Sequence, residues 1–211
     1  MSVVTRPRRS FDKPFRTMVF NARVQKTARA VEDKACACID SDWISIVIIV
    51  RIVKVTMVAA LAAFALIVAY DNTVDYDSNY EFVRHVLSMD TTFGTSVLKY
   101  RAISNEAVWH SAYALIIAVE AVTGLLLAFG ALALLRRLRL PAEIFNRAKV
   151  WAVAGLGTGF GVWFFGFLVI AGEYFAMWQS KAWNGQEAAF RITAVILAVL
   201  IYVSLPDEDL S

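Results

Sequence analysis

The stretch AVWHSAYALIIAVEAVTGLLLAFGALALL, residues 107–135, decides the fold of this chain. It holds one acidic residue, Glu120, and neither lysine nor arginine. A helix needs about 20 predominantly apolar residues to cross the ~30 Å hydrocarbon core of a bilayer. Three further apolar stretches, at 43–70, 150–171 and 188–205, are near that length or longer. The sequence therefore predicts an all-α integral membrane protein built as a four-helix bundle.

The composition agrees with a membrane protein. Hydrophobic residues make up 59% of the 211 residues, whereas soluble domains hold roughly 45–50%. A soluble protein this apolar would expose large apolar patches. We expect one membrane domain at 43–205, between a basic arm at 1–42 and an acidic tail at 206–211. The first apolar stretch begins too late in the chain for a cleavable secretory signal.

The charges between the stretches predict the orientation in the membrane. Lysine and arginine outnumber the acids by four in 1–43 and again in 136–149, whereas the acids lead by three in 71–106. The positive-inside rule then puts both termini on the inner side. We expect the bacterial inner membrane, with the mitochondrial inner membrane as the alternative because the first residues are rich in arginine. No nucleic-acid partner is expected.

The basic arm contains a segment without helix breakers at 15–37, with basic residues between apolar ones. This pattern predicts an amphipathic helix on the inner side, docked on an anionic membrane surface or on a partner. A solvated helix is the alternative. Cys36 and Cys38 are expected to be reduced thiols, because too few other ligands accompany them to bind a metal.

Two cations interrupt the first apolar stretch. Arg51 and Lys54 share one helix face, and we expect them to snorkel toward the inner headgroups. The alternative is a tilted helix in which Arg51 pairs inside the bundle. The apolar run before them would lie at or beyond the interface, which indicates contact with a partner subunit or lipid. The residues assigned to this contact are Ile44, Ile46, Ile48, Ile49, Arg51 and Lys54.

Glu120 is predicted to lie in the middle of the second span, near the bilayer centre. Ionisable residues at such depth are often functional. One interpretation is a protonatable group of a small proton-coupled transporter. A second is a structural acid, hydrogen-bonded to Thr123, Thr158 or a backbone carbonyl. A third is an ion pair with a cation of a partner subunit.

The long outer connection at 71–106 is predicted to be ordered, because a structureless loop of that length is uncommon in a compact domain. Its segment 80–89 is typical of a short amphipathic helix lying on the outer membrane surface. His85 in this segment and His110 in the second span are candidate axial ligands of a b-type haem. The alternative for each is a hydrogen-bonded interfacial histidine.

The second outer connection, at 172–187, is dense in aromatic and amide side chains. We expect it to form an ordered external cap that satisfies its own polar groups. The alternative is a site for a quinone or a lipid headgroup. The candidate cofactor-binding residues of the outer face are His85, His110, Trp178, Gln179, Trp183 and Asn184.

Four glycines at alternate positions open the third span. Spacings of the Gly-x-x-x-Gly kind allow helices to approach closely in a membrane. No strand precedes them, which excludes a nucleotide-binding loop. The glycines assigned to helix packing are Gly155, Gly157, Gly159 and Gly161.

Two strings in the outer connections carry a resemblance to a known family. They are NYEFVRHVLSMDTT at 79–92 and WQSKAWNGQ at 178–186, followed by Phe190 and Arg191. Together they resemble the bacterial family of predicted small integral membrane proteins, over about residues 45–205. The resemblance implies four spans and outer loops that carry the motif residues, but no established reaction.

No nucleophile–base pair, metal cluster or nucleotide loop is evident in the sequence, so we do not expect an enzyme. The leading hypothesis is a non-catalytic accessory subunit of a larger membrane complex, plausibly a respiratory or other energy-transducing one, with other membrane subunits and lipid as its partners. The alternatives are a redox subunit that binds haem or quinone, and a proton-coupled transporter centred on Glu120. No cofactor is expected under the leading hypothesis.

Overall fold

The structure, a computed structural model, describes the backbone of residues 13–210 and the side chains of Lys26 and residues 43–210. Predictions for the first 12 residues and for the thiols of Cys36 and Cys38 lie outside this description. The chain forms two compact units, Met1–Ile46 with Ser211, and Val47–Leu210. In the first unit, helix α1 (Lys13–Val74) begins, which confirms the helical backbone predicted for 15–37. The last residues of this first unit include Ile44 and Ile46, whose side chains are exposed.

The second unit is built from helices joined by turns and loops, with no strand among the described residues. It contains the rest of α1, then α2 (Tyr76–Ser88) and a 3₁₀ turn, η1 (Val97–Arg101). The remaining elements are α3 (Glu106–Leu135), α4 (Ala142–Ala148), α5 (Val150–Phe160), the π-helix η2 (Gly161–Tyr174), the 3₁₀ turn η3 (Met177–Gln179) and α6 (Gln186–Ser204).

Four helical segments of this fold are long and apolar enough to cross a membrane. They are Trp43–Val74, Glu106–Leu135, Ala142–Tyr174 and Gln186–Ser204, which confirms the predicted all-α membrane bundle. The third segment begins eight residues before the predicted 150, because the basic connection itself folds into α4.

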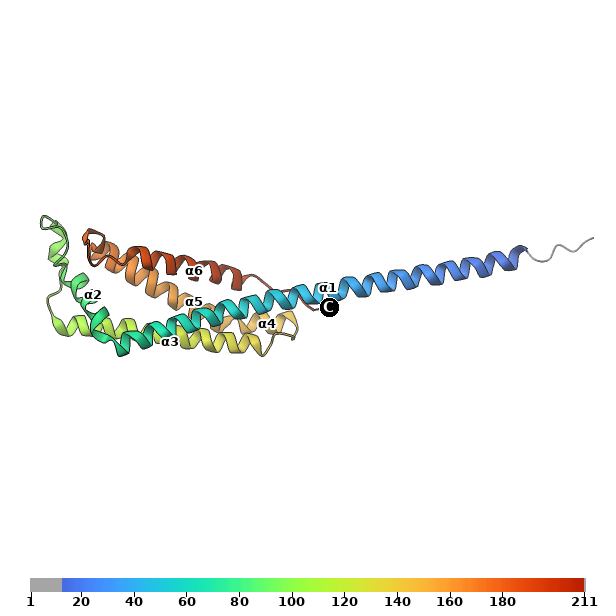
Figure 1. Ribbon diagram of the computed structural model, residues 1–211, viewed down its shortest axis with the longest axis horizontal. Helices are drawn as coiled ribbons and strands as arrows, with labels where there is room; N and C mark the ends of the chain where they lie inside the picture. The colour runs from blue at the N-terminus through green and yellow to red at the C-terminus, as the bar shows by residue number, and fades with distance from the viewer. Residues whose placement is uncertain (1–12, 211) are drawn as a thin grey trace, which may run out of the picture. The chain divides into compact units, whose positions relative to one another are not determined.

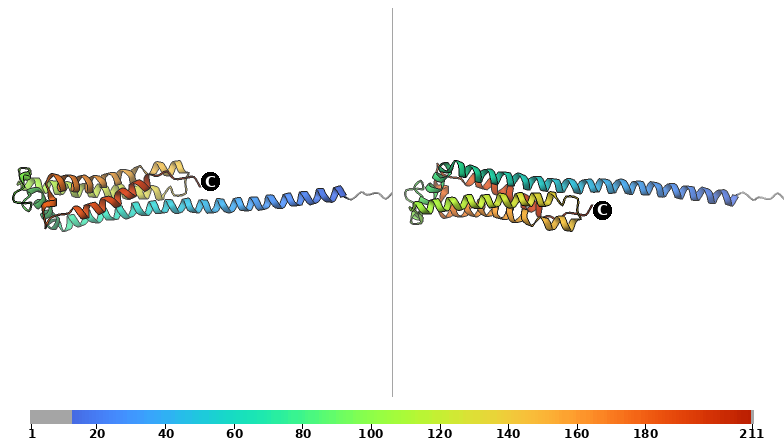
Figure 2. Two further views of the ribbon diagram at one scale, coloured as in Figure 1. Left: turned by 90° about the horizontal axis from the view of Figure 1, so that it is seen from above. Right: turned by 90° about the horizontal axis from the view of Figure 1, so that it is seen from below.

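Figures 1 and 2 show α3, α5 and α6 running alongside one another, with α2 at one end of them. We call the end that carries α2, η1 and η3 the cap end. The end that carries α4 and residues 205–210 is called the tail end.

Close backbone contacts hold the bundle core together. A Cβ added at Gly130 would lie 2.6 Å from the backbone nitrogen of Ala152, and one at Gly155 would lie 2.8 Å from Cγ of Leu127. The backbones of α3 and α5 therefore come close together at Gly130 and at Gly155. Gly124 provides the same close approach between α3 and α1, where an added Cβ would meet Leu66 at 2.6 Å.

The packing prediction for the glycines of the third span is correct for two and wrong for two. Gly155 and Gly159 face neighbouring helices. A Cβ added at Gly157 or Gly161 would meet nothing within 4 Å. The reason is the helical period, which turns residues two positions apart to opposite sides of the helix.

The predicted amphipathic helix of the first outer connection is α2, but its surroundings differ from the expectation. Its buried residues are Tyr80, Val83 and Val86. Tyr80 and Val83 pack with Tyr113 of α3, and Val86 packs with Met177 beyond η2. The apolar face of α2 thus covers other helices of the bundle rather than the membrane surface.

Candidate functional site

A chain of hydrogen bonds joins α1, α2 and α3 near the cap end. Asn79 Nδ2 donates to Asn72 Oδ1 over 2.7 Å, and Asn72 Nδ2 donates to Glu120 Oε2 over 2.8 Å. The hydroxyl of Tyr113 donates to the backbone oxygen of Asn72 over 3.1 Å. Glu120 is only 2% exposed, and its other oxygen, Oε1, has no hydrogen bond to the described residues.

The partner of Glu120 differs from the sequence expectation. Thr123 donates instead to the backbone oxygen of Val119, one turn earlier in its own helix. Thr158 likewise donates to backbone oxygens of α5. Threonine hydroxyls in helices commonly donate to a backbone oxygen of the preceding turn. The side-chain amide of Asn72 is therefore the donor to the carboxylate of Glu120.

Glu120 lies midway along α3 (Glu106–Leu135), whereas its partner Asn72 lies two residues before the end of α1. Helix α1 rises about 1.5 Å per residue, so Asn72 lies roughly 31 Å along the helix axis from the buried Arg51. That distance is about the thickness of the hydrocarbon core. Glu120 contacts Asn72 directly.

A polar pocket of about 210 Å³ surrounds this carboxylate. Glu120, Asn72, Asn79 and Tyr113 line it with hydrogen-bonding side chains, and most of the remaining lining is apolar. The side chains of Trp163 and Phe167 from the third span complete aromatic walls on the far side. The pocket thus combines hydrogen-bonding groups with flat apolar surfaces.

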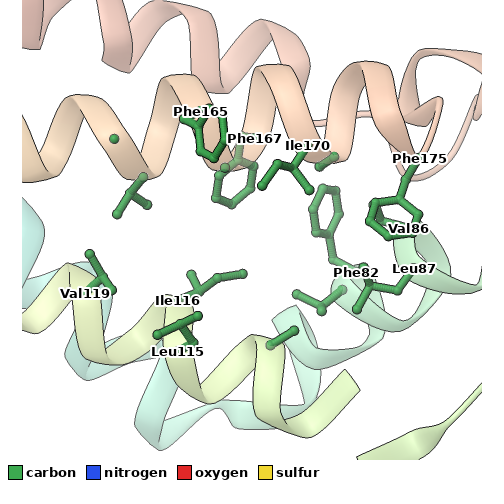
Figure 3. Close-up of a pocket in the computed structure, with 16 residues that line it drawn as sticks. Phe82, Val86, Leu87, Leu115, Ile116, Val119, Phe165, Phe167, Ile170 and Phe175 are labelled. Carbon is green, nitrogen blue, oxygen red and sulfur yellow. The ribbon is translucent and has the colours of Figure 1, made fainter. Parts of the chain in front are cut away.

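A larger apolar cavity of about 410 Å³ lies beside the polar pocket. Figure 3 shows Phe165, Phe167 and Ile170 of η2 opposite Ile116 and Val119 of α3. Every lining residue is apolar. A volume of this size falls in the range of ligand-binding cavities in proteins. The cavity and the polar pocket share four lining residues: Phe82, Val83, Ile116 and Phe167.

The π-helix η2 shapes this cavity. Hydrogen bonds between residues i and i+5 widen the helix, and π-segments occur frequently at functional sites. Gly161 and Gly166, which lie in η2, both line the cavity. An added Cβ at Gly161 would extend into open space. The two glycines therefore leave volume that larger side chains would fill.

The structure gives the two histidines separate surroundings. His110 stacks on Tyr80 with ring centroids 4.2 Å apart, and its Nδ1 lies 2.9 Å from the hydroxyl of Tyr76. Burial and the nearby Glu106 raise the pKa of the Tyr80 phenol. The phenol therefore keeps its proton and is uncharged at physiological pH.

His85 stacks on Trp183 at 4.6 Å, and its Nδ1 lies 2.8 Å from Asp90 Oδ2. Neither His85 nor His110 lines the apolar cavity or the polar pocket. Each imidazole thus has its own hydrogen-bond partner and its own aromatic neighbour. This arrangement agrees with the alternative interpretation, a hydrogen-bonded histidine.

The remaining predicted cofactor residues join the two outer connections to each other. Gln179 Oε1 accepts from the backbone nitrogen of Phe93, and Trp178 packs edge-on against the Phe93 ring. Asn184 Oδ1 accepts from the backbone nitrogen of Gln186 at the start of α6. These contacts form an ordered cap whose polar groups are bonded within the cap.

The tail end holds a buried cluster of three cations and one carboxylate. Lys54 Nζ lies 2.8 Å from Asp207 Oδ2, and Lys149 pairs with the same oxygen. Arg51 donates to the backbone oxygens of residues in the α3–α4 loop and the tail, over 2.7–2.9 Å. Arg51 and Lys54 are at most 2% exposed. The prediction that both cations snorkel to lipid is therefore wrong, and pairing inside the bundle is what occurs.

This cluster has a physical explanation in the helix ends around it. Helices α3 and α6 both end at the tail end, where their terminal carbonyls carry partial negative charge. The backbone oxygen of Leu205, just past α6, accepts from both Lys54 and Lys149. The carbonyls thus supplement the single carboxylate of Asp207.

Sequence reasoning missed several residues of both sites. Asn72 and Asn79 lie on either side of the break between α1 and α2, and no helical spacing in the sequence indicates that their side chains meet. Asp207 lay in a segment that was predicted only as an acidic tail. No group of histidine, cysteine, aspartate or glutamate among the residues described could hold a metal ion.

Comparisons with known proteins identify one family. The model of the family described as "Predicted small integral membrane protein (DUF2165)" matches residues 50–206. No curated protein and no solved structure matches the chain. The matched residues include the polar pocket, the apolar cavity and most of the tail-end cluster.

Proposed function

The chain belongs to the family of predicted small integral membrane proteins, and we propose from the geometry of its two hollows that the bundle binds a lipid-soluble quinone. The isoprenoid chain lies in the apolar cavity, and the ring lies in the polar pocket. The observation that carries this proposal is the wall of four residues shared by the two hollows: Phe82, Val83, Ile116 and Phe167. One amphipathic ligand of this shape fills both.

The chemistry of the polar pocket favours a flat ring with oxygen substituents. Glu120 Oε1, which has no partner in the described chain, accepts a hydrogen bond from a quinol hydroxyl. Phe82 and Phe167 stack on each other with ring centroids 6.1 Å apart and both line the pocket, where a quinone ring can extend the stack. A glycerol headgroup would leave these aromatic faces unused.

Blocking the cavity is expected to weaken binding of a short-chain ubiquinone by about tenfold or more, because the new side chain occupies the volume of the isoprenoid tail. The variant is Gly161→Leu, whose side chain extends into the cavity. The measurement is a titration of the protein in lipid nanodiscs, followed by quenching of tryptophan fluorescence.

Gly157→Leu is the matched control, because that glycine also has open space around it and lines neither hollow. In the same titration Glu120→Gln should weaken the quinol more than the quinone. Asn72 donates to the side chain at residue 120 and would hold the amide oxygen, which leaves the amide nitrogen, a donor only, facing the quinol hydroxyl. Equal affinity of Gly161→Leu and Gly157→Leu would contradict the proposal.

A second candidate function is that of an accessory subunit of a larger membrane complex. The observation that favours it is the exposure of Ile49 and Ile52, at 59% and 44%, beside the polar layer formed by Arg51. Both residues lie in the span Trp43–Val74, so lipid is the alternative neighbour to a partner subunit. A partner subunit would cover both side chains.

Extraction in mild detergent is expected to give an assembly that contains other proteins and is larger than the 23.5 kDa chain on native electrophoresis. Ile49→Ser should weaken this assembly, because it removes apolar contact area. Ile67→Ser, at an equally exposed position further along α1, should not. A monomer or a homo-oligomer alone would overturn this second candidate.

We further infer that the tail end faces the inner side of a bacterial inner membrane. The excess of lysine and arginine in the connection at 136–149 supports this orientation. The acidic excess at 71–106, which belongs to the cap end, agrees with it. Both the N-terminal arm and the tail then lie on the inner side.

A further inference from the structure

Two neighbouring hollows open on the tail end between α3, α4 and α5. One, of about 340 Å³, is lined by the C-terminal part of α3 and the residues that follow it. The other, of about 360 Å³, lies between α3, α4 and the start of α5. They share Phe129, Ala133 and Arg137. Together they form one continuous groove, which we call the arginine groove.

The arginine groove has an apolar part and a cationic part. Phe129, Leu132 and Trp151 expose 41–52% of their surface in the apolar part, where Phe129 packs edge-on against Trp151. Arg136, Arg137 and Arg147 line the cationic part. The two parts meet where α3 ends at Leu135, next to the basic residues.

The cationic part carries excess positive charge. Arg147 pairs with Glu143, one turn earlier in α4. The Arg137 side chain donates to the backbone oxygen of Ala133, and the side chain of Arg136 has no hydrogen bond or ion pair within the described chain. Two of the three arginines therefore lack a carboxylate partner at a point where the apolar helix surface ends.

We propose that the arginine groove binds one anionic phospholipid. Its phosphate lies against Arg136 and Arg137, and its acyl chains lie along Phe129, Leu132 and Trp151. Arginine suits this role because its guanidinium donates two parallel hydrogen bonds to phosphate oxygens. Basic pockets between membrane helices bind such headgroups, and each nearby cation adds to the attraction. The groove is separate from the proposed quinone site, and shares no lining residue with it.

Native mass spectrometry of the whole protein tests this proposal, with phosphatidylglycerol and phosphatidylcholine offered in equal amounts after delipidation. One bound phosphatidylglycerol is expected to prevail. The double variant Arg136→Gln and Arg137→Gln should lower that preference by roughly thirtyfold. Arg191→Gln, at an exposed position on α6, is the control and should retain the preference.

A second variant separates charge from folding. Arg136→Lys with Arg137→Lys retains both charges and should retain most of the preference, whereas the glutamine pair should not. Equal binding of the two lipids by the unaltered protein would overturn the proposal. Displacement of the lipid by millimolar inorganic phosphate would also overturn it, because it would show an anion site without a role for the acyl chains.

Discussion

Replacing Asp207 with asparagine is expected to destabilise the bundle by about 3–5 kcal/mol, the largest stability loss that we predict for a single side chain. The carboxylate pairs with both Lys54 and Lys149, and all three residues are at most 8% exposed. Without it, three buried cations would share only backbone carbonyls. A buried charge that loses its partner cannot recover the solvation that it gave up.

The size and the backbone contacts of residue 207 are retained in Asp207→Asn. Asn146 bonds only to the backbone nitrogen and oxygen of Asp207, so those bonds remain. The measurement is the thermal unfolding temperature of the detergent-solubilised protein, followed by circular dichroism.

Asp209→Asn is the matched control on the same segment. Its carboxylate bonds to the backbone nitrogen of Ala142 at the start of α4, where an exposed cap contributes about 1 kcal/mol. The unfolding temperature should therefore fall much less than for Asp207→Asn. Similar small shifts for both variants would mean that the carbonyls alone satisfy the lysines.

Gly130→Ala is expected to destabilise the bundle by about 1–3 kcal/mol, the typical effect of overpacking. The added Cβ would lie 2.6 Å from the nitrogen and 2.8 Å from the Cα of Ala152. Both are backbone atoms, which cannot rotate away as a flexible side chain would. Helices α3 and α5 would have to separate, and the buried neighbours Leu127 and Leu156 would lose contacts.

Gly157→Ala should act in the opposite direction, because nothing lies within 4 Å of its added Cβ. Alanine stabilises a helix relative to glycine by roughly 0.5–1 kcal/mol. Unfolding of the two variants in a denaturing detergent, measured side by side, gives the comparison. If Gly130→Ala were as stable as Gly157→Ala, the close α3–α5 approach would be wrong.

The sequence was sufficient for the parts of the fold that depend on local composition. Span number and helical class follow from apolar length, and the amphipathic pattern of 80–89 identified α2. The partners of charged groups depend on contacts distant in sequence. Asp207 meets Lys54 across most of the chain, and no local pattern indicates that pairing.

The candidate site was predictable only in part. Glu120 was recognisable, because it is an acid within an apolar stretch. Its partner Asn72 was not, because α1 continues past the predicted end of the first span and brings that amide to α3. The apolar cavity depends on the π-helix η2, which no residue pattern distinguishes from an ordinary α-helix. The two outer connections are ordered, as expected. His85 and His110 lie in separate aromatic stacks, with Trp183 and with Tyr80, and the sequence alone did not indicate those partners.

The pairing of Lys54 with Asp207 has a consequence for biogenesis. The first membrane helix is synthesised with Arg51 and Lys54 inside it, and charged residues disfavour insertion into lipid by a few kcal/mol each. Arg51 can bond to Leu138 and Leu140 once the α3–α4 loop has been made. Both hydrogen-bond partners of Lys54, the backbone oxygen of Leu205 and the carboxylate of Asp207, follow the fourth helix. The charge of Lys54 therefore stays unpaired until residue 207 has been translated.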